Sequence, residues 1–176
     1  MKNKKCKHCK DTFVPIKPLQ VVCGYNCGLL YAKANRLNAE KKDTKQRIEK
    51  LKSKSDWLRE AQSVFNAYIR ERDSDFPCIS CCKHHTGQYH AGHYLSVGSH
   101  PELRFVECNV HKQCSICNNH LSGNQIEYRK NLILKIGISD IEWLESKHDA
   151  KKYTIDDIKE IKEVYRLKLK QLKSLK

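Results

Sequence analysis

Residues 78–124 read CISCCKHHTGQYHAGHYLSVGSHPELRFVECNVHKQCSICNNHLSGN, and a Cys-x2-Cys pair lies near each end of this stretch. Cys78 and Cys81 form the first pair, and Cys114 and Cys117 form the second after 32 intervening residues. Each pair can supply two thiolates to one half of a zinc tetrahedron. An ion held by both pairs would join the ends of the segment and offset the entropy of closing a long loop. We therefore expect a structural zinc ion at the base of a hairpin.

A second cysteine cluster lies at the N-terminus. Cys6 and Cys9 form one pair, and Cys23 and Cys27 form a second after 13 intervening residues. This spacing is typical of a small zinc ribbon or treble-clef knuckle from which a helix leaves at the second pair. Ten cysteines in a chain whose start lacks a secretory leader favour metal binding over disulfides. In the cluster of residues 78–124 one ambiguity is left, because Cys82 could replace its neighbour Cys81 as a zinc ligand.

Between the pairs of the quoted stretch, the sequence predicts two strands followed by a helix. Residues 90–97 are typical of a strand with a polar start. Residues 104–114 predict a second strand, because apolar and polar side chains alternate at its beginning. After the strands, residues 115–124 can turn into a helix. His93 then lies on the first strand and Asn109 on the second.

This segment resembles a known class of enzymes. Residues 78–137 are similar to the HNH, or ββα-metal, nucleases, and the runs HAGHYLSVGSHPELRF and NVHKQCSICNNHLSGNQIEYRKNLI resemble the NinG/Rap recombination endonucleases of lambdoid phages. The resemblance extends over most of the chain, including residues 57–73. It implies a first-strand histidine as general base, a second-strand asparagine that fixes it, and a helical residue that binds the catalytic cation. Those roles fall on His93, Asn109 and Asn118.

The chemistry of these side chains agrees with the resemblance. Hydrolysis of a phosphodiester needs a base that is neutral near pH 7, and imidazole has an ordinary pKa of about 6.5. The amide oxygen of Asn109 could accept the other ring N–H of His93 and fix its tautomer. Mg²⁺ or Mn²⁺ would neutralise charge on the phosphate, and Asn118 offers an oxygen ligand.

One position departs from the family pattern. Many nucleases of this type have an aspartate directly before the catalytic histidine as a second metal ligand, whereas this chain has Gly92. On an extended strand, His90 shares a face with Gly92 and is a candidate to reach the cation instead. The alternative is that His90 contacts DNA phosphate or solvent.

Several basic side chains near the predicted site are candidates to contact DNA. Three of them also have an alternative role. The histidine at position 111 could be packed or catalytic, the histidine at position 120 could bind metal, and the arginine at position 104 could be an ordinary surface residue. The candidates are Arg104, His111, His120, Arg129 and Lys130.

The composition restricts the partners and the location of the protein. The 176 residues contain 34 Lys and Arg against 20 Asp and Glu, and the net charge of +14 favours a polyanionic partner. With a mean hydropathy of −0.72, no large core is available, so metal ions would supply local stability. No apolar run reaches the roughly 20 residues that span a bilayer. We expect a protein of the bacterial host's reducing cytoplasm, without a membrane segment or a nucleotide cofactor.

The sequence predicts an α+β chain in four segments. These are a zinc-binding module in residues 1–28, a helical arm in 29–73, a small zinc-stapled HNH-like nuclease core in 74–137 and C-terminal helices in 138–176. The arm is either a coiled coil that pairs two subunits or, as we favour, two helices separated near residues 53–55. Its apolar residues beyond the break predict a core against the hairpin.

Helix signals mark the end of the chain. Residues 125–136 predict a helix ended by Gly137, and capping-box spacings begin further helices near Ser139 and Thr154. The last helix is amphipathic and basic. It could clamp a second DNA arm, pair with another subunit or cover the surface.

These observations predict a DNA endonuclease with a catalytic Mg²⁺ or Mn²⁺ and two structural zinc ions. The resemblance implies phage recombination and branched substrates such as Holliday junctions and displacement loops. A homodimer would place two active sites on two strands. The alternative is a zinc-dependent DNA- or RNA-binding protein without catalytic activity.

Overall fold

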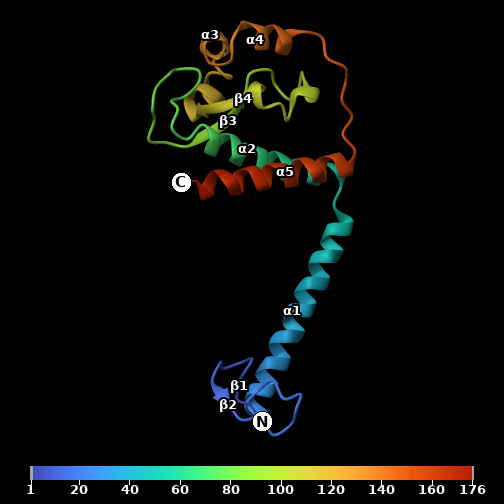
Figure 1. The fold of residues 1–176 in the computed structure, drawn as a ribbon. Coiled ribbons are helices and arrows are strands. Elements are labelled where there is room, and N and C mark those ends of the chain that lie inside the picture. Colours follow the sequence, from blue (N-terminus) through green and yellow to red (C-terminus); the bar gives the residue numbers. More distant parts are fainter. Residues whose placement is uncertain (1, 176) are drawn as a thin grey trace. The chain divides into compact units, whose positions relative to one another are not determined.

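The computed structural model describes residues 2–175, and the chain divides into two compact units, Met1–Lys52 and Ser53–Lys176 (Figure 1). Helices and two small sheets make up the described residues, which agrees with the predicted α+β class. The four segments predicted from the sequence divide the chain more finely and stay a prediction.

The first unit contains a short hairpin and one long helix. Strand β1 (Lys4–Lys5) pairs antiparallel with β2 (Thr12–Phe13). Helix α1 (Tyr25–Leu51) begins between the two cysteines of the second pair, Cys23 and Cys27. A helix was predicted to leave from this pair, and the structure confirms it. None of the 27 residues of α1 is buried in the described chain. Pairing of this helix with a second copy therefore stays a prediction.

A capping box separates α1 from the next helix, α2 (Lys54–Arg72). The Ser53 side chain accepts the backbone N–H of Asp56, and the Asp56 carboxylate accepts the backbone N–H of Ser53 at 3.0 Å. The two bonds satisfy helix donors that otherwise lack a partner. This confirms the predicted break near residues 53–55.

The second unit has three layers (Figure 1). Helices α2 and α5 (Ile155–Ser174) pack side by side against the hairpin of β3 (Tyr89–His93) and β4 (Val110–Cys114). Helices α3 (Gln125–Ile136) and α4 (Ile138–Glu145) lie on the other side of that hairpin.

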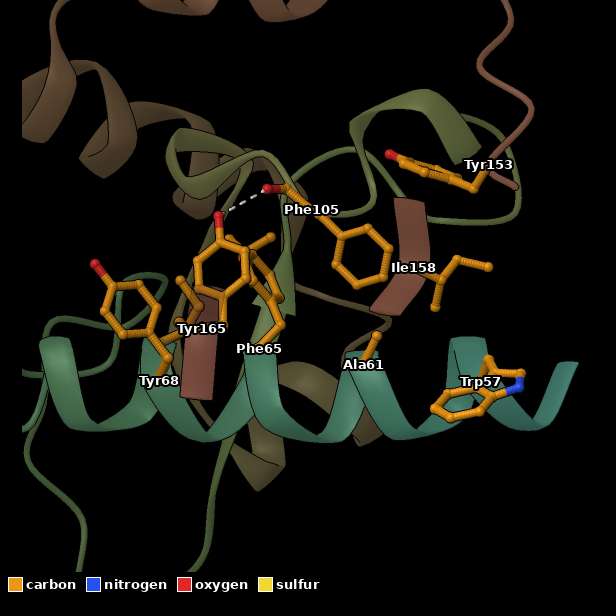
Figure 2. Close-up of a cluster of buried hydrophobic side chains, with 10 residues drawn as sticks. Trp57, Ala61, Phe65, Tyr68, Phe105, Tyr153, Ile158 and Tyr165 are labelled. Atoms are coloured by element: carbon orange, nitrogen blue, oxygen red, sulfur yellow. Dashed lines mark hydrogen bonds between the residues drawn. The ribbon is translucent and has the colours of Figure 1, made fainter. Parts of the chain in front are cut away.

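The main apolar cluster fills the space between α2, α5 and the hairpin. The ring of Phe65 meets Phe105 and Tyr165 edge to face, with centroid distances of 5.6 and 4.7 Å (Figure 2). The predicted core role of the apolar stripe on α2 is therefore confirmed. The buried members are Trp57, Ala61, Phe65, Tyr68, Ile69, Phe105, Val110, Tyr153, Ile158 and Tyr165.

The predicted second strand is too long. Only Val110–Cys114 forms β4, and 3₁₀ turns at Pro101–Leu103 and Glu107–Asn109 occupy much of the segment before it. Phe105 packs into the main cluster, whereas Val106 packs against the cluster under α3 and α4. The alternation in the sequence therefore arises from a loop that fits between two cores.

Of the other predicted helix boundaries, the end of α3 and the start of α5 are confirmed, and the cap of α4 is wrong. Gly137, with φ of 88°, ends α3 as predicted, but it also begins α4, so the capping box expected at Ser139 does not form. The capping box between Thr154 and Asp157 is present. None of the helices in residues 2–175 is both long enough and apolar enough to cross a bilayer.

Candidate metal centres and active site

Two cysteine tetrads have the geometry of closed zinc sites. Within each tetrad, all the sulfur atoms lie within 4.8 Å of one another. The Cys9–Cys23, Cys23–Cys27 and Cys81–Cys114 sulfur distances are 3.7, 3.5 and 4.0 Å. A tetrahedron with Zn–S bonds of 2.3 Å has edges of about 3.8 Å, so the residues present fit a zinc ion. The tetrads are Cys6, Cys9, Cys23 and Cys27, and Cys78, Cys81, Cys114 and Cys117.

The first pair of each tetrad has the same backbone fold. Lys10 N–H donates to Cys6 O at 3.0 Å, and Cys82 N–H donates to Cys78 O at 2.9 Å. Lys10 and Cys82 both have positive φ, 68° and 53°, in the left-handed region. Cys82 is thus the turn residue of its knuckle, and its side chain is exposed. It takes no part in the tetrad, so Cys81 is the ligand.

Backbone donors prepare one thiol in each tetrad for metal binding. Cys23 N–H and Cys114 N–H approach the sulfur atoms of Cys6 and Cys78, each at 3.3 Å. Desolvation raises the pKa of Cys6, but backbone N–H groups outweigh it and lower the pKa to about 6. Burial likewise raises the pKa of Cys78, and its backbone donors lower it below the ordinary value. A thiolate is the form that binds zinc.

His93 lies at the end of β3, where its ring is held by a main-chain group. The Nε2 atom lies 3.0 Å from the carbonyl oxygen of Arg104. Because a carbonyl only accepts, Nε2 carries the proton and Nδ1 keeps its lone pair. Burial lowers the pKa of His93, and the charge of Arg104 lowers it further, although the bond to the Arg104 carbonyl acts in the opposite direction. The ring is therefore neutral at pH 7, as a general base must be.

The predicted hydrogen bond between Asn109 and His93 is wrong, because the side chain of Asn109 bonds to main-chain groups instead. Asn109 is fully buried, and its Oδ1 accepts Leu95 N–H at 2.8 Å. Its Nδ2 donates to Leu95 O at 3.0 Å and Leu103 O at 3.3 Å. Asn109 precedes β4, and its amide ties together the two ends of the loop that carries Arg104. It therefore positions His93 through the loop instead of touching the ring.

The opposite face of the hairpin carries a second group of polar side chains. His90 and Gln113 are directly paired across the strands, and Gly92 is paired with His111. Because strand side chains alternate, these residues lie on the face away from His93. A Cβ on Gly92 would lie 2.1 Å from Gln113 Oε1, so the space left by glycine is filled by this amide.

Three unpartnered atoms on that face are candidate cation ligands, and we call them the candidate cation site. Among residues 2–175, the buried side-chain N or O atoms without a hydrogen-bond partner are His90 Nε2, His111 Nδ1 and Gln113 Oε1. Burial is the main cause that lowers the pKa of His111 to about 3, which keeps its ring neutral. Two imidazole nitrogens and an amide oxygen fit a transition metal better than Mg²⁺, which prefers oxygen ligands.

No hydrogen bond within residues 2–175 joins the predicted cation ligand Asn118 to His93. It lies in a short π-helical turn, Ile116–His120, and its Nδ2 donates to Asn119 Oδ1 at 2.7 Å. Its role as a ligand therefore stays a prediction. His120, in the same turn, is exposed and stays a candidate for a phosphate contact.

The predicted DNA contact by His111 is wrong. Its side chain is only 2% exposed, and its ring meets Tyr128 of α3 at a centroid distance of 6.4 Å. The second strand is covered by α3 on this face, which the sequence of the strand alone did not reveal.

Two further predicted DNA contacts have carboxylate partners inside the chain. Arg129 donates from Nε and Nη2 to Glu145 at 2.7 and 3.0 Å, and Lys130 Nζ lies 2.7 Å from Glu127. These pairs reduce the positive charge that each side chain offers to a phosphate. Arg104, in contrast, reaches only Gln62, at 3.4 Å, among the described hydrogen bonds.

The group that fixes β4 to α2 is not among the site residues predicted from the sequence. Asp73, at the end of α2, accepts two bonds of 2.9 Å from Arg72 and the backbone N–H of Lys112 at 3.0 Å. Arg72 also donates to Val110 O at 2.8 Å. The only sequence signal was an adjacent Arg and Asp at the end of a predicted helix.

The whole chain has known relatives. Residues 1–175 match the family model described as Bacteriophage Lambda NinG protein. "Protein ninG" of Escherichia phage lambda is 39% identical over 191 residues, covering 97% of this chain and 94% of the relative. "Protein ninG" of Escherichia phage 933W and of Salmonella phage P22 are each 40% identical over 190 residues, with the same coverage. No solved structure matches the chain.

Proposed function

The chain belongs to the NinG family of lambdoid phages, and from that premise we propose that it is a metal-dependent DNA endonuclease acting on branched recombination intermediates. The observation that carries the proposal is the hydrogen bond between His93 Nε2 and the Arg104 carbonyl. It leaves a neutral imidazole with a free lone pair at the end of a hairpin whose base carries a zinc-binding tetrad.

The proposed reaction is hydrolysis of one phosphodiester bond. His93 Nδ1 takes a proton from water, the water oxygen attacks phosphorus, and one P–O bond to the leaving oxygen breaks. The leaving oxygen takes a proton from solvent. A divalent cation, when bound, would neutralise charge on the phosphate. Asn109 holds the loop that presents the Arg104 carbonyl, so it acts as a positioning residue.

The resemblance to recombination endonucleases supports junctions and displacement loops as substrates. Two paired nicks across a junction require two active sites, so we propose a homodimer as the active form. A net charge of +14 supports a nucleic acid as the partner.

One observation favours the alternative of a zinc-dependent DNA- or RNA-binding protein. The candidate cation site offers His90, His111 and Gln113 but no carboxylate among its unpartnered atoms. A catalytic cation bound by neutral ligands alone would be held weakly.

Cleavage of a labelled four-way junction by the zinc-loaded protein in Mn²⁺ separates these functions. The endonuclease predicts nicked products that increase with Mn²⁺ concentration. Tight binding without any product, in Mn²⁺ and in Mg²⁺, would favour the binding protein and reject the enzyme.

The predicted role of His90 as a cation ligand has its own test. His90 lies on the hairpin face away from His93, so His90→Ala tests whether the catalytic cation binds on that face. Binding there predicts a higher Mn²⁺ concentration for half-maximal cleavage, because the variant loses an imidazole ligand. His84→Ala, in an exposed loop of the same segment, is the matched control. An unchanged Mn²⁺ dependence in His90→Ala would remove this residue from the site.

A further inference from the structure

One flank of helix α2, outside its buried apolar stripe, carries polar side chains. A groove of about 590 Å³ runs along this flank. Its polar lining comes from Ser55, Arg59, Gln62, Ser63, Asn66 and Arg70 of α2, together with Arg104.

The groove lies on the side of α2 away from α5. Glu60 pairs with Lys162 of α5 at 2.7 Å, whereas Gln62 accepts from Arg104 at 3.4 Å. Residues that are two positions apart on an α-helix are separated by about 200° around its axis. Helix α5 and Arg104 therefore lie on opposite flanks, and α5 does not cover the groove.

The lining has the chemistry of a phosphate-binding surface. It contains three guanidinium groups, two amides and two hydroxyls, and none of the lining residues is acidic. Within residues 2–175, Arg70 and Arg104 form no ion pair, and Arg59 lies 3.4 Å from Asp56, whose side chain is 40% exposed. Guanidinium forks bind phosphate oxygens in pairs, and amides can donate to them.

The length of the groove also fits DNA. Arg59 and Arg70 are 11 positions apart, which is about 16 Å along a helix axis. At a rise of about 3.4 Å per nucleotide, this distance corresponds to roughly five base pairs. Two exposed arginines at this separation can hold phosphates on one arm of a duplex.

Arg104 connects the groove with the proposed base. Its side chain lines the groove, while its carbonyl oxygen holds the ring of His93. We propose that this groove binds the sugar-phosphate backbone of the DNA arm being cut and directs it to His93. The inference rests on the proposed nuclease function and assigns the DNA track of that same site.

Binding measurements test the groove separately from catalysis. In a His93→Ala background, the double variant Arg59→Gln/Arg70→Gln is compared with Arg36→Gln/Arg47→Gln. The control arginines are also 11 positions apart on an exposed helix, but each is paired with an acid, Glu40 or Asp43. Both variants lose two positive charges. Zinc content and circular dichroism verify that both are folded.

The expected readout is the dissociation constant of a four-way junction at several salt concentrations. The groove variant should bind at least 10-fold more weakly near 0.15 M salt, and its log–log salt slope should fall by about 2, since each lost phosphate contact contributes about 0.9. The control variant should keep its slope. Equal weakening of both variants would mean that only the net charge acts, and would overturn the groove.

Two further results distinguish the sources of failure. If the wild type binds the junction through the groove but produces no cleavage in Mn²⁺, the nuclease function fails and the DNA groove stands. If structured RNA displaces the junction at equal concentration and matched salt, the assignment of DNA as the occupant fails.

Discussion

The ring of His93 is subject to two effects that determine its protonation. Partial burial lowers its pKa, and the bond to the Arg104 carbonyl selects the tautomer with a free Nδ1. The sequence indicated the histidine through its pattern. It could not indicate the carbonyl, because any residue at position 104 has one and only the loop conformation brings it to the ring.

The lowered pKa of His93 predicts the pH dependence of cleavage. A base with a lowered pKa stays neutral to lower pH, so the acid limb of kcat/KM should have its midpoint below the ordinary value of 6.5. Initial rates at low junction concentration, measured between pH 5 and 8 at fixed Mn²⁺, report this midpoint. A midpoint above 6.5 would contradict the burial of a catalytic imidazole.

Cys82 offers a second prediction for a single residue. Its φ of 53° is costly for a side chain with a Cβ and costs nothing for glycine. After allowing for the greater entropy of glycine in the unfolded chain, Cys82→Gly should stabilise the protein by about 0.5–1 kcal/mol. Urea unfolding with zinc present measures the change. The neighbouring Cys81→Gly should instead lose zinc, and a destabilised Cys82→Gly would contradict the assignment of the ligands.

Among the elements, helix α2 supports both the core and the hairpin. Its break from α1 and its capping box could be predicted from local sequence, because Ser53 and Asp56 bond within one turn. The predicted strand before Val110 was wrong because alternation along the chain does not distinguish a pleated strand from a loop between two cores. The bonds of Asn109 to Leu95 and Leu103 were equally hidden, since main-chain partners leave no sequence pattern.

The contact between α2 and β4 depends on Asp73, which is 2% exposed. Asp73→Asn should destabilise the protein by about 3 kcal/mol, because Arg72 and Lys135 would lose the carboxylate that they share. Urea unfolding measures the change, and Asp75→Asn is the exposed control. Equal midpoints for the two variants would contradict the role of the buried pair.

The same carboxylate predicts a pH dependence of stability. Burial raises the pKa of Asp73, but the bond and charge of Arg72 and the charge of Lys135 outweigh it and lower the pKa below 3.8. A carboxyl with a lowered pKa stabilises the fold above its ordinary pKa, and this contribution is lost as the pH falls below it. The difference in unfolding free energy between wild type and Asp73→Asn should therefore shrink below about pH 4.

At the scale of the whole molecule, each unit contains one cysteine tetrad. Both tetrads and the α+β class could be predicted, since cysteine spacing and helix signals are local. The pairing of α2 with α5 could not, because it joins segments about a hundred positions apart through contacts such as Glu60 with Lys162.

The two tetrads predict two zinc ions per chain, one in each unit. Cys27→Ser and Cys117→Ser should each reduce the zinc content to about one. Both tryptophans, Trp57 and Trp143, belong to the second unit, so their fluorescence reports that unit alone. Only Cys117→Ser should change the emission strongly. A full zinc content in either variant would contradict the tetrad that it alters.

The central claim is that His93 activates water for phosphodiester hydrolysis. Its most direct test is the single-turnover cleavage rate of a labelled four-way junction by His93→Ala, with zinc content and junction affinity matched to the wild type. We predict a rate at least 100-fold lower in the variant, as expected for loss of a general base. Cleavage by His93→Ala at the wild-type rate would contradict the account.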